Sequence, residues 1–563
     1  MLEFQQDLDP VGGSLALSAL CGAIPLLTLF LLLGGLKIRA WLSGLISFGV
    51  SLVVAVALFE MPAGQALLAG TEGAAFGFFP IMWIVINAIW VYNLTVATGH
   101  FDVLRRSFEK VSPDQRIQAI IIAFCFGALL EALAGFGTPV AITVVMLMAL
   151  GFEPLKAAAV ALIANTAPVA FGALATPIVT LSTVTSGASS APGLDVDTLG
   201  SMVGRQTPIL ALVVPLILVG VVDGKRGLRN AWLPALVCGV AFGLAQFAAS
   251  NYISVQLADI VASLVSAAAV VVLLRVWSPS EVLTAAPSTA APASVAVRSG
   301  GGGGAGIPAD EVAEDSTADV VRAYAPYLVI IAIFSLTNIT AVKDALAKEP
   351  WTFSFDWPGL DVSNTAGDPV TTTTFLLNWL PAAGTLMIIA GLITSVILRV
   401  SPSTMARTYV GTYVELRTAI ITVMAVLGLA YVMNLSGQTG SMGAWLAGAG
   451  GAFAILSPIL GWIGVAVTGS DTSSNALFGA LQVQTAQQAG LDPTLMAAAN
   501  SSGGVLGKMV SPQNLAIAAA AVGIAGREGD IFRKILGWSL VLLALMCVIV
   551  GLQSTPVLDW MVP

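Results

Sequence analysis

The amino-acid sequence predicts an all-α polytopic membrane protein, and three observations support this fold class. Of the 563 residues, 57% are hydrophobic and only 10% are charged, and the mean hydropathy of +0.91 lies far from that of soluble proteins. Apolar stretches of about 20 residues, the length that a membrane-spanning helix needs, recur along almost the whole chain. These stretches are continuous rather than alternating, which argues against a transmembrane β-barrel.

The apolar stretches predict about 12 to 14 transmembrane helices by this length criterion. The clearest stretches are 14–35, 40–59, 75–98, 232–250, 255–274, 325–341 and 376–398. The first ten residues, MLEFQQDLDP, are acidic and lack the basic region of a signal peptide. We therefore expect 14–35 to stay in the protein as a span.

Lysines and arginines in short loops predict the orientation of the chain. They follow the first and third spans and form one later cluster, namely Lys37, Arg39, Arg105, Arg106, Lys110, Arg116, Lys225, Arg226 and Arg229. Cytoplasmic loops carry an excess of positive charge, so we expect these loops on the cytoplasmic side. The N-terminus and the acidic segment after Ala341 are then expected on the extracytoplasmic side.

Residues 278–322 differ in composition from the rest of the chain. They are rich in Ala, Pro, Gly and Ser and include five successive glycines from Gly300. Such a segment cannot bury enough apolar surface to fold by itself. We expect a flexible cytoplasmic linker there, between an N-terminal membrane half, 1–277, and a C-terminal membrane half, 323–563. Its composition favours a spacer over a regulatory element.

The two halves share a pattern of interrupted apolar stretches. "NTAPVAFGALATP" at 165–177 resembles "NSSGGVLGKMVSP" at 500–512 in its Asn, hydroxyl residue, Gly and hydroxyl–Pro pair, and the same offset aligns 135–142 with 470–477. Transporters are commonly built from inverted repeats with helices broken in corresponding places. The pattern therefore predicts an inverted repeat with broken or re-entrant helices. Chance similarity is the alternative, because small residues also serve ordinary helix packing in membranes.

The predicted breaks indicate a binding site for a small anion. A break inside the bilayer frees backbone N–H and C=O groups, which is tolerated only where protein or water satisfies them. Helix N-termini at such breaks carry partial positive charge and attract a carboxylate. The residues that we expect to bind this substrate are Gly135, Gly137, Thr138, Asn165, Thr166, Ser470, Thr472, Ser473, Ser474, Asn500, Ser501 and Lys508.

Three ionisable residues within the apolar stretches are candidates for function. Glu131 lies one helical turn before Gly135, so its carboxyl is expected to bind a coupling proton; a structural hydrogen bond to a helix end is the alternative. Asp471 is either a second proton-coupling carboxylate or the N-cap of the following helix. Lys508 is the candidate cation opposite a substrate carboxylate or in a pair with an acid, unless it snorkels to the membrane interface.

Other classes of function fit the sequence poorly. The net charge of −8 argues against a nucleic-acid partner, and the four cysteines lack metal-ligand spacing, so no metal site or cofactor is expected. A hydrolase needs an activated nucleophile such as a Ser–His pair, and the one histidine, His100, follows the end of a span. A sensor would bring a folded soluble domain, which the linker composition does not provide. We predict a transporter, not an enzyme, whose partners are a small carboxylate, protons and the lipid bilayer.

Several segments resemble the lactate permease family of bacterial inner-membrane carriers. They are "FCFGALLEALAGFGTPVAI" (124–142), "LIANTAPVAFGALATPI" (162–178), "TGSDTSSNALFGALQ" (468–482), "GKMVSPQNLAIA" (507–518) and the loop at 98–118. The resemblance covers most of the chain outside the linker. It implies import of L-lactate, and of D-lactate and glycolate, by proton symport across the plasma membrane. The residues alone leave sodium coupling or another small carboxylate open, since broken helices also coordinate Na⁺.

Overall fold

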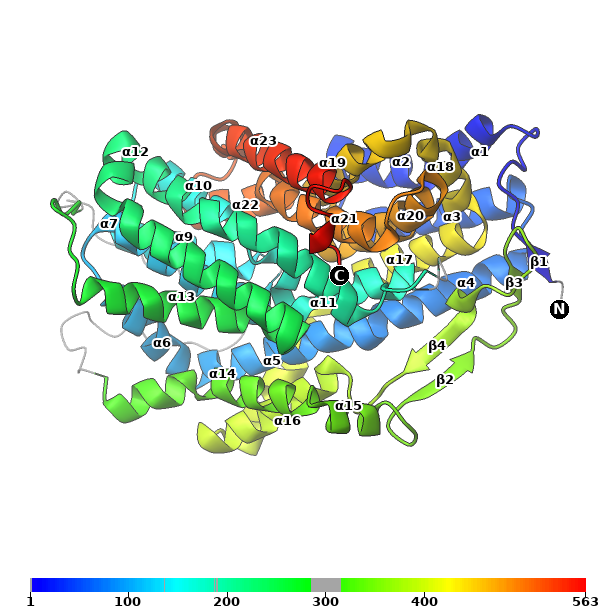
Figure 1. Ribbon diagram of the computed structural model, residues 1–563. Coiled ribbons are helices and arrows are strands. Elements are labelled where there is room, and N and C mark those ends of the chain that lie inside the picture. Colours follow the sequence, from blue (N-terminus) through cyan, green and yellow to red (C-terminus); the bar gives the residue numbers. More distant parts are fainter. Residues whose placement is uncertain (1–2, 136, 187, 189–190, 285–314) are drawn as a thin grey trace.

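The computed structural model describes residues 3–135, 137–186, 188, 191–284 and 315–563, and it is a bundle of helices that run between two ends of the molecule (Figure 1). The helices before the linker are α1 Leu15–Gly22, α2 Ile24–Phe30, α3 Ala40–Ala57, α4 Ala63–Phe76, α5 Trp83–Ala97, α6 His100–Glu109, α7 Gln115–Gln118, α8 Gly127–Ala134, α9 Thr138–Ala149, α10 Pro154–Ala164, α11 Gly172–Thr185, α12 Val196–Tyr252 and α13 Ala258–Leu274. Those after it are α14 Thr317–Thr337, α15 Thr340–Leu346, α16 Ala383–Ile397, α17 Pro402–Leu435, α18 Gln438–Leu446, α19 Phe453–Thr468, α20 Asp471–Ala489, α21 Pro493–Gly507, α22 Pro512–Ala521 and α23 Glu528–Gln553.

Short 3-10 or π-helical segments continue or join these helices. They are η1 Leu31–Gly35, η2 Gly77–Met82, η3 Ala119–Phe126, η4 Val169–Phe171, η5 Val255–Leu257, η6 Thr371–Thr373, η7 Ala447–Ala452, η8 Lys508–Val510 and η9 Asp559–Met561. The strands are β1 Phe4–Gln5, β2 Phe353–Asp356, β3 Val362–Ser363 and β4 Thr374–Leu377. β1 pairs in parallel with β3, and β2 pairs antiparallel with β4. The all-α prediction is confirmed, with these strands as a minor addition.

In the described part of the chain, ten helical segments are long and apolar enough to cross a membrane, or eleven if the bent pair α10 and η4–α11 counts as one span. The expected number was higher, chiefly because α12 counts once although it has 57 residues. Non-helical backbone at Asp223, Gly224 and Ala231 folds α12 back on itself, so that Gly239 lies against the carbonyl group of Leu212. At about 1.5 Å per residue α12 is long enough to cross twice, and the shorter apolar helices α9 and α16 add further candidates.

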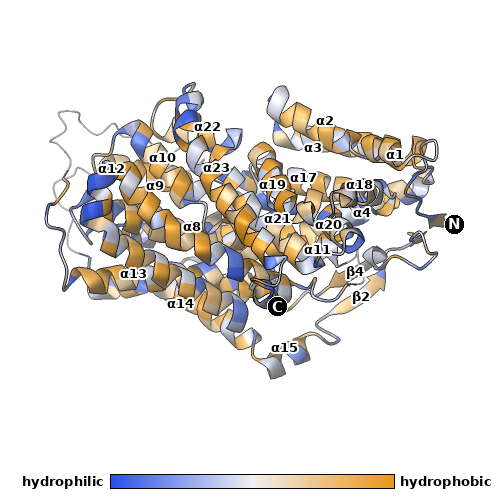
Figure 2. Cartoon of the chain, turned by 45° about the horizontal axis from the view of Figure 1, so that its top comes forward, coloured by the Kyte–Doolittle hydropathy of each residue, from blue (hydrophilic) through white to orange (hydrophobic). Residues whose placement is uncertain are grey.

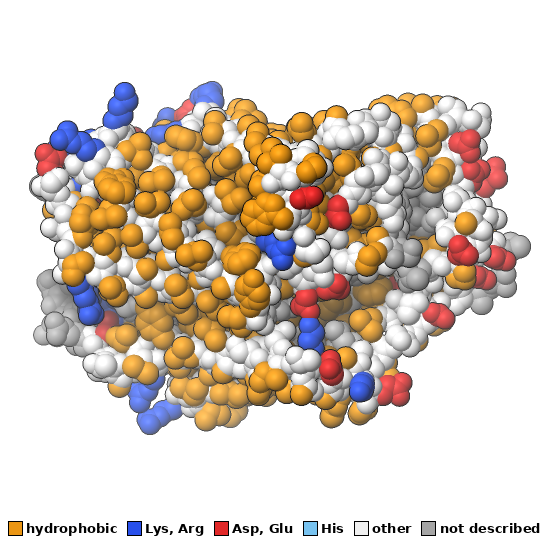
Figure 3. All heavy atoms as spheres, in the orientation of Figure 1, with side chains coloured by type: hydrophobic (Ala, Val, Ile, Leu, Met, Phe, Trp, Pro, Cys, Tyr) orange, Lys and Arg blue, Asp and Glu red, His pale blue; other side chains and the backbone are white. Residues whose placement is uncertain are grey.

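The two ends of the bundle differ in charge, and the surface between them is apolar. Lys and Arg side chains gather at the end that carries α6, α7 and the turn inside α12, whereas Asp and Glu gather near the N-terminus and the strands (Figures 1 and 3). Helices such as α1, α2 and α3 are apolar over most of their surface (Figure 2), and large residues such as Leu20 and Leu27 are exposed there. A lipid bilayer is the environment that fits such an exposed apolar band.

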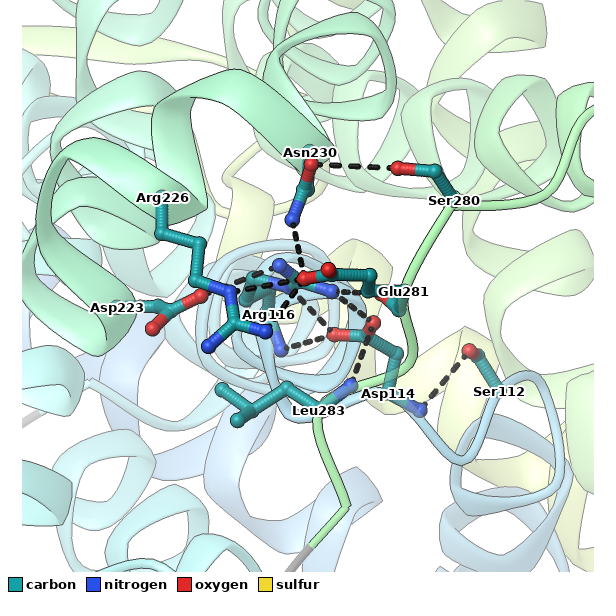
Figure 4. Close-up of polar contacts among 9 residues, drawn as sticks. All are labelled: Ser112, Asp114, Arg116, Asp223, Arg226, Asn230, Ser280, Glu281 and Leu283. Carbon is teal, nitrogen blue, oxygen red and sulfur yellow. Dashed lines mark hydrogen bonds and ion pairs between the residues drawn. The ribbon is translucent and has the colours of Figure 1, made fainter.

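A buried arginine fixes the start of the helix that carries Glu131. In Figure 4 the Arg116 guanidinium donates two hydrogen bonds to Asp114, at 3.0 and 2.7 Å, and one to Asp223 at 3.1 Å. It also donates to the backbone carbonyl of Glu281. The segment α7–η3–α8 is thereby tied to the turn inside α12 and to the residues after α13.

The ends of the predicted linker are held by these and similar contacts. Leu283 donates its N–H to Asp114 at 3.1 Å, and Asp315 forms an ion pair with Arg106 at 2.6 Å. Most of the predicted linker, 285–314, lies outside the described residues. The division of the chain into two membrane halves stays a prediction.

We expect Arg116→Gln to destabilise the protein strongly, by about 3–5 kcal/mol, because it leaves Asp114 buried without its cation. Thermal unfolding of the purified protein in detergent measures this loss. Arg226→Gln is the matched control: Arg226 pairs with Glu281 at the surface, where both side chains are more than half exposed, and such pairs contribute about 0–1 kcal/mol. Equal shifts for the two variants would contradict the anchoring role of Arg116.

Candidate functional site

Four helix interruptions lie around one cavity. The first two belong to the N-terminal part of the chain, where α8 gives way to α9 and α10 gives way to α11 across a bend of 64°. The other two lie between α19 and α20 and between α21 and α22. All four fall in the segments where the sequence predicts broken helices. Each half of the chain contributes two breaks, but their relation as an inverted repeat stays a prediction.

The break between α10 and α11 holds an unusual backbone. Ala173, Leu174 and Ala175 have φ angles of 44°, 56° and 59°, in the left-handed region that residues with a side chain rarely adopt. Three such residues in a row store strain, which persists only where the surrounding structure imposes it. All three are buried, and Ala173 lines the cavity. Strain of this kind concentrates at functional sites.

The cavity has a volume of about 690 Å³, which is ample for a small organic acid. Residues from all four breaks line it, together with the loop before α3 and one face of α17. The polar and glycine residues among them are Lys37, Arg39, Glu131, Gly135, Gly172, Thr176, Thr418, Thr422, Thr468, Gly469, Ser470, Asp471, Thr472, Ser473, Lys508 and Gln513.

An ion pair between the two halves of the chain lies at the wall of this cavity. The ammonium of Lys508 is 2.6 Å from Oε1 of Glu131, and Asn165 donates a hydrogen bond to Oε2 at 3.0 Å. The side chains of Glu131 and Lys508 are only 4% and 8% exposed. Gly172 packs directly on the Glu131 carboxylate, where a side chain would collide with it. The charge of each partner is therefore balanced chiefly by the other.

Asp471 is a second buried carboxylate at the cavity. Its Oδ2 accepts a hydrogen bond of 2.6 Å from Ser501 and a long one of 3.5 Å from Asn475. Its Oδ1 has no hydrogen-bond partner among the residues that the structure describes. The interpretation of Asp471 as a helix cap is wrong, because Ser470 caps α20 by accepting from the N–H of Ser473. Asp471 instead occupies the first turn, where a helix N-terminus favours negative charge.

The predicted substrate residues fall into three groups by position. Those that line the cavity are Gly135, Ser470, Thr472, Ser473 and Lys508. Asn165 and Ser501 lie behind them and hold the two carboxylates. The others take part in backbone turns or packing contacts away from the lining, namely Gly137, Thr138, Thr166, Ser474 and Asn500.

Sequence reasoning missed part of the lining. Thr176 belongs to the Thr–Pro pair that recurs in the second half, so the repeat pattern was a usable signal for it. Thr418 and Thr422 lie one turn apart on α17 and carry no comparable signal. His100 opens α6 at the basic end, outside the cavity lining, and burial lowers its pKa from the usual value.

The chain is similar in sequence to known proteins along its whole length. A family model described as L-lactate permease matches residues 18–557. The L-lactate permeases of Bacillus subtilis (strain 168) and Escherichia coli (strain K12) are 40% and 39% identical to this chain, with 100% of each chain covered. Glycolate permease GlcA of Escherichia coli (strain K12) is 40% identical over 98% of each chain. The solved structure of the YdaH transporter of Alcanivorax borkumensis aligns with a TM-score of 0.44, at 13% identity over 86% of each chain.

The ion pair predicts a non-additive effect of mutation on stability. Lys508→Met alone leaves the Glu131 carboxylate buried without its cation, which costs about 3–5 kcal/mol when a buried pair is broken. Adding Glu131→Gln removes that charge, so the double variant should regain most of the lost stability. Thermal unfolding of the single and double variants measures this coupling. Additive losses would show that the pair is not the interaction that balances these charges.

Proposed function

Because the chain belongs to the L-lactate permease family, we propose that it imports L-lactate, and also D-lactate and glycolate, across the plasma membrane by proton symport. The family is one of multi-pass membrane transporters, not enzymes, and its named members include lactate and glycolate permeases. One observation carries the proton-coupled mechanism, namely the buried ion pair of Glu131 and Lys508 at the cavity wall.

In the proposed mechanism the proton binds one partner of this ion pair and the substrate binds the other. While Glu131 is ionised, it occupies the ammonium of Lys508. A proton on Glu131 removes its charge and releases Lys508, whose ammonium then binds the carboxylate of the substrate. Proton binding thus strengthens anion binding, and by thermodynamic linkage anion binding strengthens proton binding to the same extent.

Lys508 binds the carboxylate of the substrate, and the hydroxyl-rich start of α20 suits the hydroxyl group of a 2-hydroxy acid. Ser470, Thr472 and Ser473 line the same cavity as Lys508, and the first N–H groups of α20 add positive partial charge. Asp471 also lines the cavity, and its carboxylate is the acceptor for the substrate hydroxyl group in this proposal. Glycolate lacks only the methyl group of lactate, so it keeps both polar anchors.

The charge of the two ends supports the orientation in this proposal. By the positive-inside rule the end with α6, α7 and the turn inside α12 faces the cytoplasm, and the N-terminus lies outside. In this proposal the substrate site opens to the cytoplasmic side, because the basic residues Lys37 and Arg39 line the cavity. We infer that an outward-open arrangement alternates with this one around the four breaks.

Sodium coupling is the second candidate, and the free Oδ1 of Asp471 favours it. Carboxylate, hydroxyl and backbone oxygen atoms at a broken helix are the ligands that transporters use for Na⁺. The ion pair favours protons instead, because a proton on Glu131 frees a cation for the substrate whereas a sodium ion at Asp471 leaves Lys508 occupied.

Uptake of labelled L-lactate by proteoliposomes tests the proposed function. With one proton per lactate anion, an inward gradient of one pH unit should support about tenfold accumulation, since both correspond to about 1.4 kcal/mol. Transport should not respond to membrane potential, because the two charges cancel, and excess glycolate should compete. Accumulation that requires sodium and ignores a protonophore would replace the proposal with the second candidate.

Glu131→Gln is the sharpest variant for the coupling mechanism. The neutral amide frees Lys508 permanently, so the variant should exchange labelled for unlabelled lactate at equal pH but should not accumulate lactate from a pH gradient. Both assays are run in the same proteoliposomes. The matched control is Glu415→Gln, which neutralises an exposed carboxylate of α17 outside the cavity lining and should behave as wild type. Accumulation by the Glu131 variant at the wild-type level would remove Glu131 from the coupling step.

A further inference from the structure

Asp259 is a further buried carboxylate, and it lies outside the cavity lining described above. It stands in the first turn of α13 and is 1% exposed. Its Oδ1 accepts a hydrogen bond of 2.8 Å from Gln246 of α12, whereas its Oδ2 has no partner in the described part of the chain. The Gln246 side chain in turn accepts a hydrogen bond from Thr207 at 3.2 Å. Asp259 therefore has one oxygen held in place and one oxygen free.

The structural bond of Asp259 does not require a carboxyl group. An asparagine has the same shape and its carbonyl oxygen accepts from Gln246 equally well. A carboxyl group in a membrane span without a cationic partner is costly, and such residues are rarely kept without a role in an ion or proton path. The ability to bind a proton is what distinguishes Asp259 from its amide.

Asp259 is electrostatically connected to the ion pair of the substrate site. α13 packs on α8, the helix that carries Glu131, and on α12, which presents the neutral Gln246. α8 carries Glu131, whose ion-pair partner is Lys508 of η8, and the charges of both act on Asp259. Any change of charge at Asp259 therefore acts directly on the pair that the coupling mechanism uses.

A second cavity lies one helical turn from Asp259, which does not itself line it. It has a volume of about 320 Å³ and lies between α11, the start of α12 and the segment α14–α16. Gln256, one turn before Asp259, lines it, and so do Asp197 and Lys343, which are about half exposed and form an ion pair with each other. This cavity belongs to the acidic end, whereas Lys37 and Arg39 mark the opening of the first cavity. Asp259 thus lies on a helix that packs against the helix of Glu131, one turn from a residue that lines the cavity of the acidic end.

We propose that Asp259 is a second proton-binding site, which passes protons from the second cavity to Glu131. The step breaks the O–H bond of the Asp259 carboxyl group and forms an O–H bond on the Glu131 carboxylate, with the proton carried across by water. Net charge does not change. The inference rests on the proposed proton symport and adds to it a proton route from the acidic end that the substrate does not share.

Asp259→Asn tests this route, because it keeps the bond to Gln246 and removes the titratable group. We expect exchange of labelled for unlabelled lactate at equal pH to stay within about twofold of wild type. Accumulation of lactate from a pH gradient should fall at least about tenfold. Lactate-induced proton uptake, which a pH-sensitive dye inside the vesicles reports, should fall at least about tenfold as well. Asp259→Glu restores a carboxyl group and should regain part of the accumulation. The matched control, Ser263→Ala, lies one turn further along α13 and removes only a local hydrogen bond, so it should behave as wild type.

The outcomes separate this inference from the proposed function. Accumulation by Asp259→Asn at the wild-type level, or an equal loss of exchange and accumulation, would overturn the proton route while leaving symport through Glu131 intact. Sodium-driven accumulation by the wild-type protein itself would overturn both. If Asp259→Asn does not fold, Asp259→Ser removes the carboxyl group and leaves room for water, and it is judged by the same pair of assays.

Discussion

The buried ion pair of Glu131 and Lys508 is the interaction on which the arrangement of the site depends. Its partners are 377 residues apart in the chain, and each lies beside a broken helix of a different half. Neither charge is stable alone in a membrane interior, because the loss of hydration exceeds what neutral neighbours return. The helices that carry Glu131 and Lys508 therefore need each other in register, and the cavity forms where they meet.

The breaks make this pair possible and are themselves stabilised by polar residues nearby. Where α21 gives way to α22, the carbonyl group of Lys508 accepts hydrogen bonds from Ser511 at 3.0 Å and Asn514 at 3.2 Å. This carbonyl group is therefore satisfied although the helix is interrupted there. On the other side Asn165 donates to Glu131 from the end of α10. Residues that a soluble protein uses as ordinary caps here satisfy backbone and charge inside the bilayer. The polar residues in the apolar stretches are thus part of one network.

Sequence reasoning predicted the parts of this site better than their contacts. Glu131, Asp471 and Lys508 stand out because charged residues are rare in apolar stretches, and Gly and Pro mark the breaks. Nothing local indicates that Glu131 meets Lys508, since that contact depends on how distant helices pack. For the same reason the sequence did not show that α12 folds back at Asp223 and Gly224. It also did not single out Asp259, which lies at the edge of a clearly recognised span. The sequence shows which residue types are rare in an apolar stretch, but which side chains contact one another depends on the fold.

Proton and substrate are tightly coupled in the proposed cycle, because each compensates the charge imbalance that the other creates in the site. A protonated carrier without substrate has a buried Lys508 with no anion, and a loaded carrier without its proton has two anions for one cation. Each of these half-loaded states leaves a buried charge uncompensated, at a cost of about 3–5 kcal/mol. Because every 1.4 kcal/mol corresponds to a factor of ten, such states are disfavoured by about a hundredfold to a few thousandfold. Only the empty carrier with its ion pair and the fully loaded carrier then change conformation readily, so the two ligands move together.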